Sequence, residues 1–564
     1  MPEPFSRIPL PLAAALERIG LAGGTAAATE TLQRVTVWKQ LVQDYCPVAE
    51  SLEWQLARLL WNRDGALPFA DGSVPYVVNN DGRLSADAAA VLFANCAEAG
   101  PADGPIRVLE LGAGSGLFTR FFLDEFKDLC QRSARDFYER LSYCVTDSSP
   151  RTVEQWNERG VFAEHAGHVA ARTMDAAGAE AEGPLRAVFC NYVLDVLPMA
   201  FVRKISEGWE QLSVRTWITD DDAVLRQYST LTIDEIRARA ASRDPQGLQE
   251  LLPLFPLLEC ETEFLPAGED ALPGLADLEA ACCSPSFAYN YGAIHCLDSL
   301  QRVLEDCGFV LINDYGPAQP EELEGQHPGN RFGPVVAAVV NLPLLEGHFL
   351  RHGLESWKPE GDDARRLHAR LLSRGGLPRT RQAFESRFAA QTLDPVEALV
   401  DQARQQAAAG LLREALAGFR LAIERNPRNW QVIGEAAEFV TGSLRDPASG
   451  LELARAAIEL NPWYSPYLWN VLGDCLSALK RPQDAHECYL QACRIHPADA
   501  QTHLRLAASW LQIGDPARSL EAVASGLASD SNAMLRHVFL QRQQQAIDAL
   551  SRRWNAERAT AARR

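Results

Sequence analysis

The chain has 564 residues, of which 47% are hydrophobic and 23% charged, an ordinary globular composition that excludes gross disorder. With 74 acidic and 54 basic residues its net charge is −20, which disfavours nucleic acid and favours a cationic protein segment as partner. The thirteen cysteines are scattered and form no CxxC pair, which predicts a reducing, cytoplasmic location and no metal site. Apolar runs such as 251–258 are far shorter than the roughly 18 residues that span a bilayer, so no membrane partner is expected.

The hydrophobic pattern divides the chain into four parts. Residues 1–100 carry apolar residues at helical spacing and predict a mostly helical N-terminal lobe. In 101–345 short apolar strands alternate with helices, which predicts an α/β, Rossmann-like domain with a parallel sheet. Inside it, the Pro-, Glu- and Leu-rich segment at about 220–287 is interpreted as an insertion that covers the active site. The polar stretch 346–395 is interpreted as a linker to an all-α region at 396–564.

The strands of the α/β domain are short apolar runs. They are predicted at 106–111, 141–145, 186–190 and 310–314, with a last strand at 335–341.

An internal repeat follows residue 396. Similar segments end at Pro427, Pro462 and Pro497, each 35 residues after the one before, and a period near 34 is typical of tetratricopeptide repeats. The unit that runs from Trp469 to Pro497 matches the repeat pattern at its large, small and proline positions. A weaker unit and a closing helix at 530–564 complete the array, which predicts a protein-binding surface.

The strongest chemical signal is the sequence E-L-G-A-G-S-G, which runs from Glu110 to Gly116 between a strand and a helix. Glycines allow the backbone to turn tightly and to approach a ligand, and the helix N-terminus offers free N–H groups. The spacing departs from the dinucleotide fingerprint and resembles motif I of class I S-adenosylmethionine (SAM) methyltransferases. That resemblance implies SAM as the cofactor, with its methionine part on the glycine loop.

Acidic and amide residues close the next strands. Asp147 ends the second strand and is expected to bind the ribose hydroxyls. Asp175 is either near the adenine amine or on a surface loop, and Asn191 ends a strand at the ligand edge. The predicted cofactor-binding residues are Glu110, Gly112, Ala113, Gly114, Gly116, Asp147, Ser148, Asp175 and Asn191.

Four short motifs at 147–150, 191–198, 314–316 and 331–333 resemble the MidA-like family of SAM-dependent methyltransferases over roughly residues 70–345. The mitochondrial members methylate an arginine of a respiratory complex I subunit. Where the family shows N-E-x-x-D-x-x-P, this chain has Tyr192 in place of the glutamate. A carboxylate there could grip a guanidinium by paired hydrogen bonds and a tyrosine cannot, which puts an arginine substrate in doubt.

The catalytic residues predicted from these motifs are Asn191, Asp195 and Asp314. Asn191 is expected to accept a hydrogen bond from a substrate amine, and the two aspartates are candidate proton acceptors. Asp195 is equally well explained as a helix cap. Tyr192 is a candidate for stacking on the substrate, and His295 is either a substrate contact or a structural histidine.

Three functions fit these observations. The first is a methyltransferase that acts on a nitrogen of a protein recruited by the repeats. The second is a small-molecule methyltransferase whose repeats serve assembly. The third is a scaffold without catalysis, which the intact loop and Asp147 argue against because a scaffold does not need them.

Overall fold

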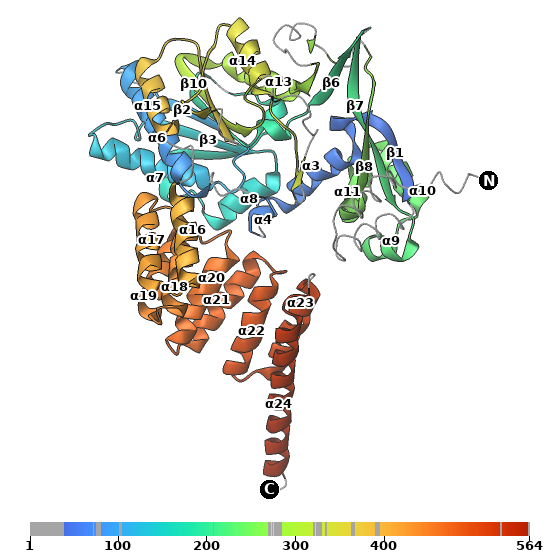
Figure 1. Ribbon diagram of the computed structural model, residues 1–564, viewed down its shortest axis with the longest axis vertical. Helices are drawn as coiled ribbons and strands as arrows, with labels where there is room; N and C mark the ends of the chain where they lie inside the picture. The colour runs from blue at the N-terminus through green and yellow to red at the C-terminus, as the bar shows by residue number, and fades with distance from the viewer. Residues whose placement is uncertain are drawn as a thin grey trace, which may run out of the picture.

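The computed structural model describes residues 39–561, with gaps at 71–72, 75–79, 101–103, 182, 207, 269–271, 273, 276–284, 320–321, 323–329, 333–334, 363–366, 390–394 and 531–532. Figure 1 shows a central α/β domain, an accessory lobe beside it, and a helical array that descends from the α/β domain.

A seven-stranded sheet forms the centre of the α/β domain. Its strand order is β13-β14-β10-β5-β2-β3-β4, and β2, β3, β4, β5 and β10 run parallel. The strands are β2 (Ile106–Leu111), β3 (Leu141–Asp147), β4 (Val169–Thr173), β5 (Leu185–Asn191), β10 (Leu304–Tyr315), β13 (Glu355–Trp357) and β14 (Leu367–Ser373). The Rossmann-like prediction is therefore confirmed.

Helices cover both faces of this sheet. On β5, Val188 and Cys190 pack into one apolar core, while Ala187 and Phe189 pack into the other. The first core includes α13 (Tyr291–Gln301) and α14 (Leu342–Arg351). The second includes α6 (Arg83–Ala99), α7 (Leu117–Arg132), α8 (Pro150–Arg159) and α15 (Pro378–Phe388). Because successive strand side chains point to opposite faces, a fully buried strand reads as a continuous apolar run.

The accessory lobe is built around a second, antiparallel sheet. Its order is β1-β7-β6-β9, with β8 paired to β7. Its elements are β1 (Lys39–Pro47), β6 (Ala200–Ile205), β7 (Gly208–Thr219), α9 (Asp222–Tyr228), α10 (Ile233–Ser242), α11 (Pro245–Leu251), β8 (Glu259–Pro266) and β9 (Ser286–Tyr289). The insertion thus begins near residue 200, before the predicted 220, because β6 and β7 belong to it.

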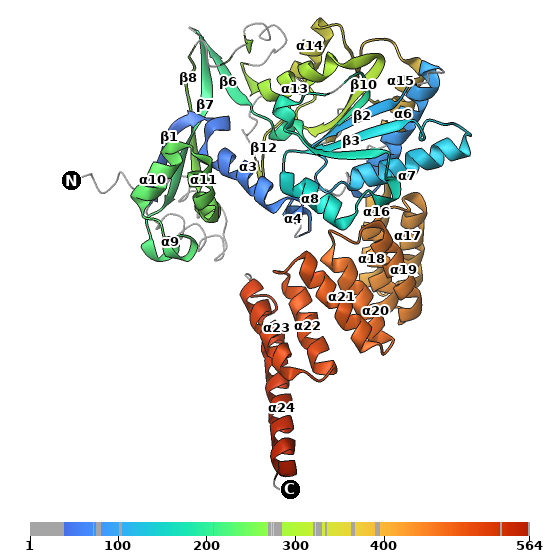
Figure 2. The same ribbon diagram turned by 180° about the vertical axis from the view of Figure 1, so that it is seen from behind.

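Short elements join the lobe to the α/β domain. The helices α3 (Leu52–Asp64) and α4 (Leu67–Ala70) lie between the two parts, as Figure 2 shows from behind. Two short strands, β11 (Asn330–Phe332) and β12 (Val335–Ala337), pair with each other in a two-stranded sheet. Short 3₁₀ helices occur at Val48–Glu50, Ala163–His165, Ala176–Gly178, Leu194–Val196 and Leu252–Leu257.

The sequence predictions differ from the structure at three places. The N-terminal lobe was predicted to be mostly helical; residues 1–38 lie outside the described residues, and in the rest 39–47 forms strand β1, which pairs with β7 in the accessory sheet, ahead of α3, α4 and α6. The predicted last strand at 335–341 is only the three-residue β12. The predicted linker at 346–395 contains β13, β14 and α15, and β14 pairs with the central strand β10. The apolar residues of β14 alternate with His368 and Arg370 and lie between charged segments, which gave the region a polar average.

The C-terminal region confirms the tetratricopeptide repeats. Helix pairs α16 (Pro395–Ala408) and α17 (Leu412–Arg425), α18 (Trp430–Gly442) and α19 (Pro447–Leu460), α20 (Pro466–Ala478) and α21 (Pro482–Ile495), and α22 (Ala500–Gln512) and α23 (Pro516–Ser529) are followed by α24 (Arg536–Ala561). In the third pair, a Cβ on Gly473 would lie 2.4 Å from the Tyr489 ring. The small residue therefore sets the close approach of the two helices.

The repeats and the α/β domain share one apolar core. Its buried members from the α/β side are Ala66, Phe69, Leu117 and Phe121, and those from the repeats are Trp430, Ile433, Ala457, Tyr464 and Leu468. The array is therefore packed against the domain and is not a separate unit on a flexible tether. Within the described residues no helix is long and apolar enough to cross a membrane.

The assignment of β14 to the central sheet gives a stability prediction. Leu371 is fully buried in β14, so Leu371→Ala should lower the free energy of unfolding by about 2–5 kcal/mol, as core truncations do. Glu360 is exposed in the same stretch, and Glu360→Ala should change stability by less than about 0.5 kcal/mol. Urea unfolding measures both effects. Equal, small changes in the free energy of unfolding would indicate that the stretch is a linker and not part of the core.

Candidate functional site

A cavity of about 550 Å³ opens where β2, β3 and β5 end. The far wall comes from α3, α4 and the segment around β12 (Figure 2). Of the predicted residues, those that line it are Gly112, Ala113, Gly114, Asp147, Ser148, Asp175, Asn191, Tyr192 and Asp195. The structure thus brings together residues that are up to 83 positions apart in the sequence, from Gly112 to Asp195.

The glycine loop has the backbone that its sequence requires. Gly112 and Gly114 have φ angles of 60° and 56°, a region in which side chains are strained. A Cβ on Gly112 would lie 2.7 Å from Val193, and one on Gly114 would lie 2.6 Å from the Phe69 ring. Both positions therefore need glycine for conformation and for space.

Asp147 ties this loop to its surroundings. Its carboxylate accepts hydrogen bonds from the backbone N–H of Gly114 at 3.0 Å and of Ser149 at 2.9 Å. The indole N–H of Trp61 donates a third, at 3.0 Å. Burial raises the pKa of Asp147, and the three donors oppose that shift. Since two carboxylate oxygens offer about four acceptor positions, the group keeps capacity for a ligand hydroxyl.

Two predicted cofactor residues lie outside the cavity wall. Glu110 is buried beneath the loop, where its carboxylate accepts hydrogen bonds from the hydroxyls of Thr119 and, at 2.7 Å, Tyr143. Burial raises its pKa to about 7. Gly116 caps α7 with a φ of 76°, and a Cβ there would lie 2.9 Å from Phe162. Glu110 lies near the end of β2 and Gly116 directly precedes α7. Both residues therefore support the ends of the loop without lining the cavity.

Asn191 lines the cavity with one side-chain atom bonded and the other unpartnered. Its carbonyl oxygen already accepts a hydrogen bond of 2.8 Å from the amide of Asn313 on the neighbouring strand. Its own amide nitrogen is buried and has no partner among the described residues. Asn191 therefore has an unpartnered donor among the residues that line the cavity, and its predicted role as acceptor for a substrate amine stays a prediction.

The acceptor in this region is Asp195. It lines the cavity from the turn after β5, and its Oδ1 is buried without a hydrogen-bond partner in the described part of the chain. Burial raises the pKa of Asp195 to about 7. The N-cap of this turn is Val193, and Asp195 lies inside the turn.

Asp314 supports the same turn from outside the cavity wall. One carboxylate oxygen accepts from the backbone N–H of Leu194 at 2.9 Å, and the other from that of Tyr315 at 2.8 Å. Burial, together with the nearby charge of Asp195, raises the pKa of Asp314 well above its usual range. Two buried carboxyls in one place favour a shared proton over two charges.

Tyr192 faces the cavity in a strained conformation. Its φ is 54°, in the left-handed region that a bulky residue rarely adopts, and such strain is often held at functional sites. Its ring lies 5.4 Å from the ring of Tyr315, and both line the cavity. The two rings form an aromatic wall beside Asp195.

Of the two remaining candidates, Asp175 lines the cavity and His295 does not. Asp175 lines the cavity and forms an ion pair of 2.7 Å with Arg58 of α3. Its other oxygen accepts from the backbone N–H of Ala177, so it is also a local cap. His295 lies on the exposed side of α13 and does not line the cavity, because the buried face of that helix points into the core. Among the described residues, no group of side chains could hold a metal ion.

Sequence reasoning missed the N-terminal wall of the cavity. This wall contains Trp54, Arg58, Trp61, Phe69 and Asn80. On α3 the apolar spacing reads as an ordinary core helix, so periodicity alone gives no signal for a site. The one sequence feature that hints at a site is the pair Trp54 and Trp61, about two helical turns apart, and this signal is weak.

The cavity suits an adenosine cofactor. Its volume falls within the roughly 300–1,000 Å³ of small-molecule sites. A polar end with the glycine loop and Asp147 adjoins an apolar wall with Trp54, Phe69 and Val336. The unpartnered amide of Asn191 gives it a buried donor without a protein acceptor.

The comparisons with known proteins agree with this geometry. Residues 89–332 match the model of a family described as "Putative S-adenosyl-L-methionine-dependent methyltransferase". The resemblance predicted from the motifs is thereby confirmed over these residues, and the family description names the predicted cofactor. No curated protein matches the chain.

Solved structures resemble each part of the chain. One from Burkholderia thailandensis, bound to S-adenosyl-homocysteine, has 16% identity and a TM-score of 0.39, covering 66% of this chain and 97% of its own. A tetratricopeptide protein of Thermus thermophilus has 22% identity and a TM-score of 0.24, covering 30% of this chain and 89% of its own. The MamA protein has 13% identity and a TM-score of 0.23, covering 30% of this chain and 94% of its own.

The strained glycine loop gives a binding prediction. Gly114→Ala should weaken SAM binding about tenfold or more, because the left-handed conformation costs roughly 1–2 kcal/mol with a Cβ and the methyl group displaces Phe69. A Cβ on Gly178 meets open space, so Gly178→Ala should bind SAM like the unchanged protein. Calorimetry with SAM checks the pair; equal affinities would show that the loop does not contact the ligand.

Proposed function

We propose that this chain is an active SAM-dependent methyltransferase that methylates a nitrogen of a protein substrate recruited by its tetratricopeptide repeats. The observation that carries the chemical part is the buried, unpartnered carboxylate oxygen of Asp195, which lines the same cavity as the glycine loop. We place the protein in the cytoplasm, as its cysteine pattern predicted.

The residues of the cavity support one orientation of the cofactor. Gly112 to Ser115 and Asn191 would hold the methionine part, Asp147 would accept from the ribose, and Asp175 would lie near the adenine. When bound, SAM supplies an activated methyl group, so the protein needs to align the nucleophile and exclude water. Trp61 and Phe69, in an edge-to-face contact of 5.6 Å, form the wall that excludes water.

Asp195 suits a nitrogen acceptor. An amine attacks only after it loses its proton, and a carboxylate with a pKa of about 7 can take that proton at neutral pH. Asp314 holds the Asp195 turn by accepting a hydrogen bond from the backbone N–H of Leu194. The Tyr192 and Tyr315 rings would hold the alkyl part or the cation of the incoming side chain.

The role of Asp195 gives a pH prediction. The pKa of Asp195 is raised, so the active carboxylate forms as the pH rises through about 7, and the turnover rate should rise over that range and then level. Asp195→Asn should lower turnover by about 10² or more and leave SAM affinity nearly unchanged. As a matched change, Asp175→Asn should alter SAM affinity but keep the pH dependence. A rising limb that survives in Asp195→Asn would exclude Asp195 as the proton acceptor.

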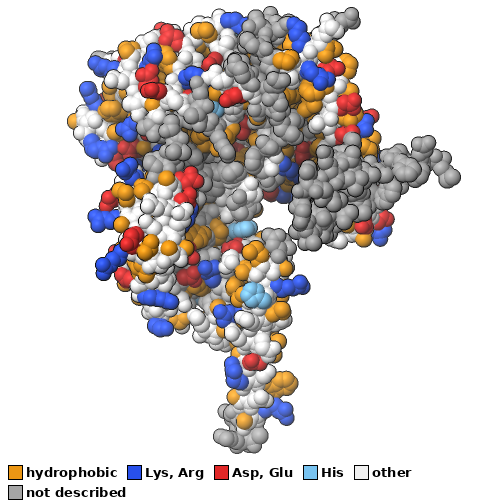
Figure 3. Space-filling model, in the orientation of Figure 1, with side chains coloured by type: hydrophobic (Ala, Val, Ile, Leu, Met, Phe, Trp, Pro, Cys, Tyr) orange, Lys and Arg blue, Asp and Glu red, His pale blue; other side chains and the backbone are white. Residues whose placement is uncertain are grey.

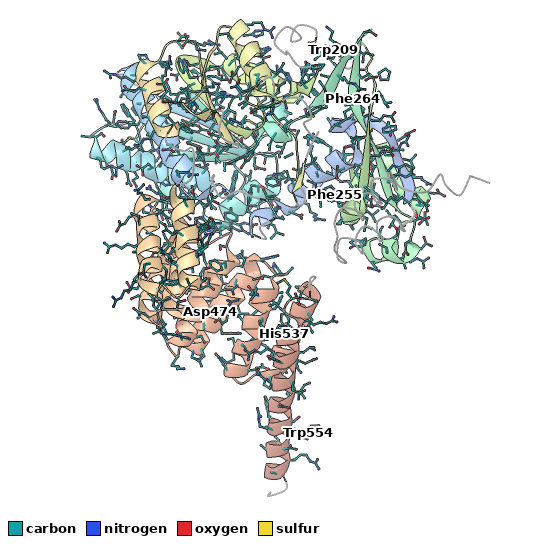
Figure 4. All side chains as sticks on the ribbon, in the orientation of Figure 1. Trp209, Phe255, Phe264, Asp474, His537 and Trp554 are labelled. Atoms are coloured by element: carbon teal, nitrogen blue, oxygen red, sulfur yellow. The ribbon has the colours of Figure 1, made fainter. Side chains whose placement is uncertain are left out.

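The repeats support the protein-substrate part. Their first helices are joined side to side by polar contacts: Arg404 with Glu435 at 2.6 Å, Tyr467 with Glu438 at 2.6 Å, and Arg505 with Asp474 at 3.0 Å. Asp474 is labelled on the array in Figure 4, and Figure 3 shows acidic and basic side chains interspersed on the face of the array seen there. This polar face offers a peptide partner specific contacts.

Labelling of a cell extract tests the proposal. Incubation with radiolabelled SAM, followed by separation by size, should label a protein band, and a labelled small molecule would favour the small-molecule alternative. No label at all would favour the scaffold. Asp474→Lys should weaken labelling of the band while SAM binding stays intact. Asp484→Lys, on the second helix of the same repeat, is the matched control, and equal losses from both would exclude recruitment by this face.

A further inference from the structure

The repeats hold the backbone that enters the cofactor cavity. The indole N–H of Trp430 donates to the carbonyl of Asn80 at 2.8 Å, and the amide of Asn426 donates to the carbonyl of Asp81 at 3.0 Å. The next residue, Gly82, packs so closely that a Cβ there would lie 2.6 Å from Arg428. Three consecutive residues before α6 are therefore fixed by side chains more than 340 positions away.

Asn80 passes this restraint to the glycine loop. Its side-chain oxygen accepts a hydrogen bond from the hydroxyl of Ser115, in the middle of the loop, and both residues are buried. Ser115 in turn accepts from the backbone N–H of Leu117, at the start of α7. A short chain of hydrogen bonds thus runs from α18 of the repeats to the loop.

A second, apolar connection lies beside it. The Phe69 ring stands against Gly114 and lines the cavity, and it belongs to the same buried cluster as Trp430, Tyr464 and Leu468. On the outer side, Arg428 forms ion pairs with Glu125 at 2.5 Å and with Asp128 at 3.4 Å on α7. The repeats therefore contact the cavity wall, the support of the glycine loop and the first helix of the cofactor site.

We infer that the repeat array is a structural part of the cofactor site, and that Trp430 is a positioning residue that sets SAM affinity through Asn80 and Ser115. This inference rests on the proposed SAM site. It gives the repeats a second role, because any partner that shifts α18 then changes cofactor affinity as well as substrate capture. By linkage, SAM changes the affinity for that partner by the same factor.

Removal of one hydrogen bond tests this role in the full-length chain. Trp430→Phe keeps the ring in the apolar cluster and deletes the bond to Asn80. SAM affinity, measured by calorimetry, should fall about fivefold to tenfold, the equivalent of one buried hydrogen bond whose acceptor is left unpaired.

Trp469→Phe is the matched control. Trp469 also donates to a backbone carbonyl, that of Pro462 at 3.0 Å, but entirely within the repeats. Its SAM affinity should stay within about twofold of the unchanged protein. An unchanged affinity in Trp430→Phe, or an equal loss in both variants, overturns the inference. If the unchanged protein itself binds no SAM, the proposed function fails first and the inference fails with it.

A double-mutant cycle identifies the route. Ser115→Ala breaks the last hydrogen bond of the chain, so Trp430→Phe should weaken SAM binding less in that background than alone. Fully additive losses would show that Trp430 acts by another route, and would contradict the role assigned to Asn80.

Discussion

The buried carboxylate of Asp147 is the interaction on which the site depends. It receives its three hydrogen bonds from the glycine loop, from the start of α8 and from α3, so it fixes three separate segments around one charge. A buried charge is tolerated only when it is bonded in this way, and removal of any donor leaves it less well satisfied. The geometry of the loop, and the position of α3 as a wall of the cavity, both follow from that requirement.

The repeat array packs directly against the α/β domain. Repeat arrays usually contact mainly their own neighbours, and a separable array would leave catalysis untouched when removed. Here the buried cluster around Phe69, Phe121 and Tyr464 joins the array to the cofactor domain. Loss of the repeats would expose this apolar surface and release the Asn80 contact. The repeats and the cavity wall are therefore in direct physical contact in this chain.

Local patterns predicted local features well. The glycine loop, Asp147, the parallel strands and the 35-residue repeat period follow from short-range sequence rules, and the structure places them as expected. What failed depended on long-range pairing. Strand β1 forms because it pairs with β7. Strand β14 lies in a stretch with a polar average, and it is recognised as a strand by its pairing with β10. The hydrogen bond from Asn313 to Asn191 joins two strands and is likewise a long-range contact that short-range rules do not predict.

A crystal structure of the full chain with S-adenosylhomocysteine tests the central claim, that the cavity is a cofactor site completed by the repeats. The account predicts the ligand against Gly112 to Ser115, with its ribose hydroxyls on Asp147 and with Trp430 still bonded to Asn80. A ligand bound elsewhere on the chain, or one bound in the cavity while the repeats stand away from Asn80, would contradict it.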